Sequence, residues 1–172
     1  MRLRPRPRRL LSAALATAAT VAALLTPTAA GVAAAAPARP NDAWVPCTAA
    51  SPVNVVFTGG FSFINGMRFC VGAYQLVMQH DGNMVIYGNT GVALWDTQTE
   101  GFPGDHAIMQ SDGNLVVYQG TQWLWNSRTG GRPGAYLCFQ TDGNLVVYGP
   151  PEMTPTDNCD PRNSPALWAS KT

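Results

Sequence analysis

Hydrophobic and polar residues alternate in short runs through most of the chain. The runs "YQLVMQ", "NMVIYG", "NLVVYQ" and "NLVVYG" are rich in β-branched and aromatic residues. Such runs, with turn signals about every 8–12 residues, are typical of short β-strands. No stretch after residue 38 shows the 3.6-residue apolar period of an amphipathic helix. The sequence therefore predicts an all-β domain.

One pattern, Q-x-D-G-N-(L/M)-V-(V/I)-Y, occurs three times. The copies begin at Gln79, Gln110 and Gln140, 31 and 30 residues apart. A second landmark follows each copy: "ALWDTQTEG", "WLWNSRTGG" and, at the C-terminus, "ALWASKT". Each repeat of this kind is one unit that buries its apolar face against its neighbours. The repeats predict three units of three or four strands, about ten to twelve strands in all.

The Asp-Gly of each copy predicts a two-residue hairpin turn, because Gly tolerates a positive φ. Along the strand that follows, alternate side chains face opposite sides of the sheet. One set is apolar and is expected to point inward: Met84, Ile86, Leu115, Val117, Leu145 and Val147. Trp95, Trp125 and Trp168 are expected near the axis around which three such sheets close. The pattern alone predicts an internal three-fold prism or barrel.

The opposite face carries the Asn, Val and Tyr of the motif, and the turn returns Gln beside Asn. Two amides, a carboxylate, a phenol and a small apolar patch are thereby gathered in one shallow cluster. Asp only accepts hydrogen bonds, whereas Asn, Gln and Tyr both donate and accept. Adjacent hydroxyls of a sugar ring need this combination, with Val against the C–H face of the ring. A turn explains Gly and an Asp or Asn that caps its own backbone, but it does not explain Gln and Tyr in three copies.

The first 38 residues differ in composition from the rest. "MRLRPRPRRL" carries five arginines and no acid, and an alanine-rich apolar stretch follows. A basic segment, an apolar segment and an A-x-A-like end are typical of a secretory signal. We expect a signal peptide over 1–38, cleaved near Ala36 or Ala38, and one secreted domain over 39–172.

The charge of the remaining domain excludes some partners. Residues 39–172 contain six Lys and Arg and ten Asp and Glu, a net charge of about −4. No basic cluster remains, which argues against binding to nucleic acid or to an anionic membrane surface. Pro27 and Gly31 keep the apolar run of the signal shorter than a membrane span, so no membrane insertion is expected.

Four cysteines follow the signal: Cys47, Cys70, Cys138 and Cys159. In an exported chain an even count indicates two disulfides, for which three pairings exist. The absence of a C-x-x-C spacing argues against a zinc site. We expect the two local bonds, Cys47–Cys70 and Cys138–Cys159, each closing a loop of about 20 residues worth ~3 kcal/mol. Cys159 lies in an insertion over 149–165, rich in Pro, Asp and Asn, which is predicted to be a loop.

The triplicated motif resembles that of the bulb-type mannose-binding lectins, and the resemblance covers residues from about 45 to 172. It implies a β-prism II fold, with three antiparallel four-stranded sheets around a pseudo-three-fold axis. It also implies three calcium-independent sites, with no metal and no cofactor. In the family, Asp and Asn bind the axial O2 of mannose, Gln binds O3, Tyr binds O4 and Val contacts the ring carbons. Carried over, the sites are Gln79, Asp81, Asn83, Val85 and Tyr87; Gln110, Asp112, Asn114, Val116 and Tyr118; and Gln140, Asp142, Asn144, Val146 and Tyr148.

Two features depart from the family's pattern. The usual single disulfide of the family is not at these cysteine positions. The insertion over 149–165 follows Tyr148 directly, so it would either cover the third site or extend it to longer glycans. In the family the C-terminal strand can be exchanged between protomers, and a homodimer of that kind is a further expectation.

The sequence thus predicts a secreted, non-enzymatic lectin that recognises α-mannose residues of glycans. Two alternatives stay open: an inert prism that acts through protein contacts, and a lectin-like antibacterial protein of the bacteriocin type. A glycoside hydrolase needs two carboxylates flanking one bond, and one Asp per hairpin does not supply them. One carboxylate per turn also falls short of the six to eight oxygens that Ca²⁺ takes.

Overall fold

The computed structural model describes residues 45–102, 106–151 and 159–171. The predicted signal peptide over 1–38 and the start of the domain predicted over 39–172 lie outside these residues, so the cleavage site and the domain boundary stay predictions. The described part of the chain contains twelve β-strands and no helix. Accordingly, none of its segments is a helix that could span a membrane. The predicted all-β class is confirmed.

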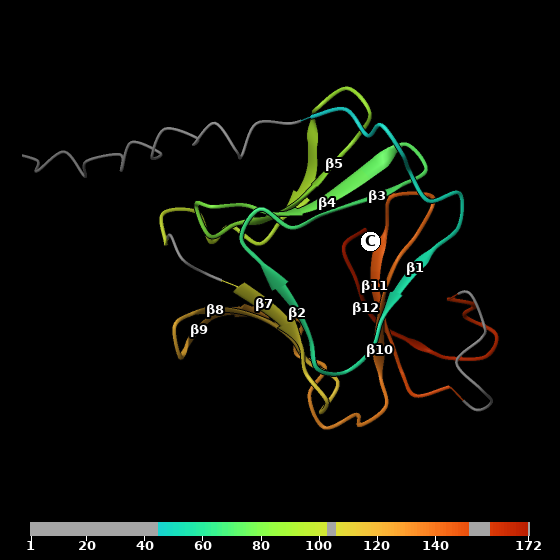
Figure 1. Cartoon of the computed structure of the whole chain (residues 1–172). Helices are drawn as coiled ribbons and strands as arrows, with labels where there is room; N and C mark the ends of the chain where they lie inside the picture. The colour runs from blue at the N-terminus through green and yellow to red at the C-terminus, as the bar shows by residue number, and fades with distance from the viewer. Residues whose placement is uncertain (1–44, 103–105, 152–158, 172) are drawn as a thin grey trace, which may run out of the picture. The chain divides into compact units, whose positions relative to one another are not determined.

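The strands form three antiparallel sheets of four strands each (Figure 1). Their orders are β3-β4-β5-β6, β2-β7-β8-β9 and β1-β10-β11-β12. The strands are β1 (Val55–Phe57), β2 (Phe61–Ile64), β3 (Arg68–Val71), β4 (Tyr74–Met78), β5 (Met84–Tyr87), β6 (Ala93–Asp96), β7 (His106–Met109), β8 (Leu115–Gln119), β9 (Gln122–Asn126), β10 (Tyr136–Phe139), β11 (Leu145–Tyr148) and β12 (Ala166–Ala169). Both the strand number and the three-sheet arrangement agree with the prediction.

Each repeat supplies three consecutive strands, and the fourth strand comes from the segment before the first motif. β3 completes the first sheet, β2 the second and β1 the third. The N-terminal segment over 55–71 therefore runs through all three sheets in turn. This segment carries no copy of the motif, which is why the repeat alone left open whether a unit has three strands or four.

The inner faces of the three sheets share one hydrophobic core. All six residues predicted to point inward are buried in it, and each such side chain contributes about 1.5–3 kcal/mol. Trp95, Trp125 and Trp168, on the last strand of each sheet, meet edge to face with ring centroids 5.3–5.6 Å apart. The first strands contribute a second ring cluster: Phe57, Phe61, Phe63 and Phe69. The predicted position of the tryptophans is confirmed.

Both predicted disulfides are present, with Cα atoms 5.9 Å apart for Cys47–Cys70 and 6.1 Å apart for Cys138–Cys159. The first joins the segment before β1 to β3, and the second joins the insertion to β10. Cys138 and Cys159 belong to a small cluster separate from the shared core. This disulfide thus lies on the outer face of its sheet. The outer face is turned away from the shared core and carries the motif.

Candidate carbohydrate-binding sites

Each motif forms a tight hairpin; residues 79–87, 110–118 and 140–148 are called copy 1, copy 2 and copy 3 below. The backbone N–H of the motif Gln donates to the carbonyl of the motif Asn at 2.8–2.9 Å in all three. Three residues lie between them, and the last is the Gly, with φ of +93° in copy 1, +94° in copy 2 and +83° in copy 3. The predicted two-residue turn is therefore wrong by one residue, because the Gly closes a three-residue loop. The prediction that Gln returns beside Asn is confirmed.

A hydrogen bond joins the two ends of each motif. The Gln Nε2 donates to the Tyr Oη at 2.9 Å for Gln79–Tyr87, 2.8 Å for Gln110–Tyr118 and 3.0 Å for Gln140–Tyr148. The pairing register shifts directly before the tyrosine in every copy. Such a β-bulge re-aims a side chain and is common beside functional sites. The tyrosine accepts from the glutamine and keeps its own O–H as a donor.

The motif aspartates hold the turns. In each copy the Asp Oδ1 accepts the backbone N–H of the Asn two residues later, at 2.9–3.0 Å. This is the local cap that a turn alone would explain. In copies 2 and 3 the aspartates, Asp112 and Asp142, are exposed. Their Oδ2 atoms are therefore the carboxylate oxygens that a ligand would reach.

The motif asparagines are held by the second landmark of each repeat. Their Oδ1 atoms accept from the hydroxyls of Thr97, Ser127 and Ser170 at 2.9–3.1 Å. The same hydroxyls accept the backbone N–H of the residue after each Asn, at 3.0 Å. With the carbonyl end fixed, each asparagine is left to present its Nδ2 amino group.

Sequence reasoning missed these hydroxyl residues. The signal was present, because a Ser or Thr stands two residues after each of the three core tryptophans. A second Thr, Thr99 or Thr129, also donates to the carbonyl of the motif Gly in copies 1 and 2. The landmark therefore supports the site as well as the core.

The motif valines lie on the outer face and are almost fully covered. Val85, Val116 and Val146 are each only 2–3% exposed, and none belongs to the shared core. They form the floor of each site, and neighbouring side chains leave little of them accessible. The contact that a sugar ring could make with them is correspondingly small.

Copy 2 is the most open of the three. A hollow of about 270 Å³ lies over it, lined by His106, Ile108, Gln110, Tyr118, Gly120 and Thr121. In copy 1, by contrast, Gln79 and Asn83 are buried. The Asp81 carbonyl accepts two N–H groups, from Gly101 and Phe102 at 2.9 and 3.1 Å, whereas the Asp112 carbonyl accepts one, from Arg132 at 2.7 Å.

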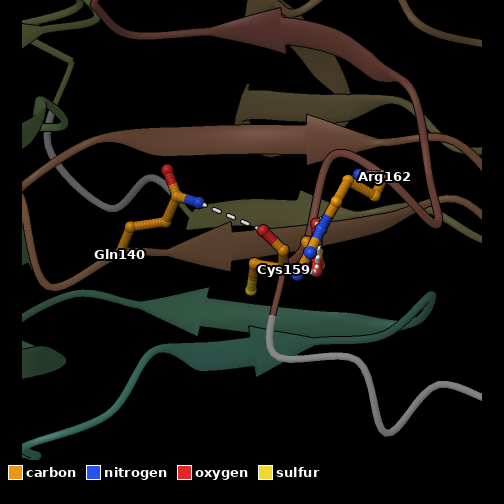
Figure 2. A network of polar contacts seen from close by, with 4 residues as sticks. Gln140, Cys159 and Arg162 are labelled. Atoms are coloured by element: carbon orange, nitrogen blue, oxygen red, sulfur yellow. Dashed lines mark hydrogen bonds and ion pairs between the residues drawn. The ribbon is translucent and has the colours of Figure 1, made fainter.

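The insertion covers the Gln140–Tyr148 end of copy 3, while Asp142 stays exposed. Figure 2 shows Gln140 facing the carbonyl of Cys159, which accepts from its Nε2 at 3.4 Å. Tyr148 is only 3% exposed and packs with Cys138 and Cys159. Burial raises the pKa of the Tyr148 phenol, and the bond from Gln140 partly opposes this. Of the two outcomes expected from the insertion over 149–165, the described residues show cover; residues 152–158 lie outside them.

Within the described ranges, no group of three or more His, Cys, Asp or Glu side chains could hold a metal ion. What each site does offer is a fixed set of neutral donors and acceptors with one carboxylate. That set suits hydroxyl groups, each of which donates one hydrogen bond and accepts another.

No protein-family model and no curated protein matches the sequence, but several solved structures do. Monomeric monocot mannose-binding lectins from Gastrodia elata share 34% identity and a TM-score of 0.56, over 70% of this chain and 97% of theirs. A lectin from Allium sativum shares 33% identity and a TM-score of 0.54, over 58% and 97%. The mannose-specific agglutinin of snowdrop (Galanthus nivalis) bulbs, solved with methyl-α-D-mannoside, shares 31% identity and a TM-score of 0.54, over 61% and 98%.

The three sheets, the shared core and the triplicated hairpins of this chain thus agree with relatives that it matches over nearly their whole length. The chain belongs to the monocot, or bulb-type, mannose-binding lectin family and has its β-prism II fold.

Proposed function

We propose that this chain is a secreted, non-enzymatic lectin that binds α-mannose residues of glycans without calcium. The observation that carries the proposal is the repeated site geometry. In each copy a Gln–Tyr hydrogen bond of 2.8–3.0 Å joins the two ends of a motif whose Asn is held by a neighbouring hydroxyl. Neither the packing of the core nor the hairpin turn requires this hydrogen bond, yet it is present in all three copies.

The donors and acceptors match the hydroxyls of one hexose. The Asn Nδ2 donates and the Asp Oδ2 accepts, and together they would hold one hydroxyl, O2 by the family resemblance. The Gln carbonyl and the Tyr hydroxyl would hold the next two, O3 and O4. Because O2 is axial in mannose and equatorial in glucose, the Asn and Asp would select mannose. The snowdrop relative was solved with methyl-α-D-mannoside.

Each site is shallow, so we expect monovalent binding with a Kd of about 1 mM, or about −4 kcal/mol. Several sites on one rigid domain raise the avidity for a multivalent glycan. Copy 3 is the weakest of the three, because Tyr148, which would bind O4, is only 3% exposed.

Secretion is supported by the two disulfides, since such bonds persist in oxidising compartments. A homodimer remains part of the proposal. β12 pairs with β11 of its own chain, and strand exchange would replace this pairing by the same pairing with a second copy. Light scattering after gel filtration distinguishes a dimer from a monomer.

Isothermal titration of the secreted protein with methyl α-mannoside and methyl α-glucoside tests the proposed function. We expect a millimolar Kd for the mannoside and at least tenfold weaker binding of the glucoside. Equal binding of both sugars would contradict the role of Asn and Asp. A glycan array without any mannoside signal would favour action through protein contacts instead.

A further inference from the structure

One position on the outer face distinguishes the three copies. It lies four residues before the motif Gln and directly opposite the motif Tyr. The pairs are Gln75 with Tyr87, His106 with Tyr118 and Tyr136 with Tyr148. Side chains directly opposite in an antiparallel pair are neighbours on one face. The residue at this position therefore borders the sugar hollow beyond the tyrosine.

In copy 1 the segment before β1, which contains Val45 and Cys47, packs on this position. Gln75 is only 2% exposed, and its Nε2 donates to the Val45 carbonyl at 2.8 Å. Cys70, which pairs directly opposite Gln75, holds that segment through its disulfide to Cys47. A hollow of about 180 Å³ borders Gln75, but it contains neither Gln79 nor Tyr87, so it is separate from the motif of copy 1.

In copy 3 the second disulfide has the same effect. Tyr136 is 7% exposed, and its ring stacks on Tyr148 with centroids 5.6 Å apart. Cys138 and Cys159 pack in the same cluster. Tyr136 borders a hollow of about 260 Å³, but this hollow contains neither Gln140 nor Tyr148 and is separate from the motif of copy 3.

In copy 2 neither of the two disulfides lies at this position. None of the four cysteines lies on β2, β7, β8 or β9. His106 is half-buried, and its ring stacks on Tyr118 with centroids 5.6 Å and planes 17° apart. The hollow that contains Gln110 and Tyr118 continues past the phenol to His106 and Thr121.

The chemistry of this extension suits a second sugar. Imidazole offers an apolar ring face, and its two nitrogens donate and accept hydrogen bonds, as does the Thr121 hydroxyl. Stacking on Tyr118 fixes the orientation of His106, so little conformational freedom would be lost on binding. We propose that copy 2 is an extended site, in which a second residue of a neutral mannose oligosaccharide contacts His106 and Thr121. The proposal rests on the proposed function.

The test isolates copy 2 by placing Asn83→Asp and Asn144→Asp in the protein, which keep the Oδ1 acceptors but replace the amino donors of copies 1 and 3. Methyl α-mannoside and an α-linked mannobiose are titrated against this background, with and without His106→Ala. We expect the mannobiose to bind 3–10-fold more tightly than the monosaccharide. His106→Ala should remove this difference and leave the methyl α-mannoside Kd within twofold. Gln122→Ala, an exposed change on neighbouring β9, is the control and should change neither Kd.

A mannobiose that binds no more tightly than methyl α-mannoside would overturn the extended site. An equal loss of affinity for both sugars in His106→Ala would also overturn the extended site, because His106 would then only position Tyr118. If methyl α-mannoside itself does not bind to the wild type, the proposed function fails first, and this outcome is distinct from the others. His106→Gln keeps a donor and an acceptor; it should retain part of the mannobiose preference and replaces His106→Ala if that variant does not fold.

Proton NMR gives an independent readout, since the chain has only two histidines, His80 and His106. In the copy 2 background, mannobiose should shift the imidazole C–H signals of His106 more than methyl α-mannoside does. The His80 signals should shift little, and by the same amount, with either sugar. Identical His106 shifts with the two sugars would overturn the proposal.

Discussion

The Nε2 of Gln110 lies 2.8 Å from the Oη of Tyr118, eight residues further along the chain. The bond links the end of β7 to β8 and fixes the roles of both groups. One N–H of the glutamine donates to the phenol oxygen, so its carbonyl oxygen and its second N–H are left for a ligand, and the phenol keeps its proton as a donor. An acceptor and a donor held side by side are what two adjacent sugar hydroxyls require.

Replacing Tyr118 by Phe removes one end of this bond and the donor that faces the hollow. In the copy 2 background we expect a 3–10-fold weaker Kd for methyl α-mannoside, corresponding to the loss of about one net hydrogen bond. The unfolding free energy should change by less than ~1 kcal/mol, since Tyr118 is half-buried. Tyr74→Phe, outside the motif, should leave the Kd unchanged in the same titration.

Ser127→Ala tests the support of the asparagine. The Ser127 hydroxyl donates to Asn114 Oδ1 and accepts the buried N–H of Leu115. Its loss leaves that N–H without an acceptor, which costs about 1–3 kcal/mol, and loosens the asparagine that would bind the sugar. Both the unfolding free energy and the mannoside affinity of copy 2 should fall.

The exposed Ser62 of β2 provides the matched control, because Ser62→Ala removes a hydroxyl at the surface of the same sheet. Denaturant unfolding and titration of the two variants give the comparison. If Ser127→Ala is as stable as Ser62→Ala, the Ser127 hydroxyl does not support the site.

Removal of the Cys138–Cys159 bond should open copy 3. In Cys138→Ala/Cys159→Ala the backbone of residue 159 is no longer held beside Gln140 and Tyr148, and the Tyr148 hydroxyl becomes available to a ligand. We expect about 3 kcal/mol lower stability and tighter mannoside binding at copy 3, measured with copies 1 and 2 disabled by Asn83→Asp and Asn114→Asp. Cys47→Ala/Cys70→Ala opens a loop of similar length and should not change copy 3. The same affinity of copy 3 in both double variants would show that Cys159 does not block it.

Burial of Tyr148 makes a pH prediction. Its pKa is raised above the ordinary value of 10.0, chiefly by burial. Because the phenol loses its proton more readily in the unfolded chain, stability should be unaffected by this group below about pH 10. It should then fall as the pH rises through the raised pKa of the folded state.

Phenolate absorbance resolves this titration when the wild type is compared with Tyr148→Phe. In Cys138→Ala/Cys159→Ala, where the cover is released, the Tyr148 pKa should move back toward 10. A Tyr148 pKa that does not respond to loss of the disulfide would mean that Cys159 is not the source of the burial.

The repeat made most of the fold predictable. Three copies at nearly equal spacing predict three equivalent sheets, and the period of two separates Ile86, which packs in the core, from Val85, which does not. The pairing of the cysteines also followed, since each local pair closes a short loop. The turn predicted that Gln79 lies beside Asn83, but not its hydrogen bond to Tyr87, whose direct partner across the strands is Gln75.

What the sequence left open depends on long-range placement. The strands over 55–71 carry no motif, so nothing local indicated that β1 and β2 complete sheets formed by later repeats. The cover of copy 3 depends on where the Cys159 carbonyl lies once the disulfide forms. The difference between Gln75, His106 and Tyr136 lies in what packs on them, and spacing carries no information about that.

A crystal structure of the protein soaked with methyl α-mannoside tests the central claim most directly. We predict one hexose in the hollow of copy 2, with hydroxyls within hydrogen-bond distance of Gln110, Asn114 and Tyr118. Clear density for the sugar at another surface, with the hollow of copy 2 filled only by water at saturating mannoside, would contradict it.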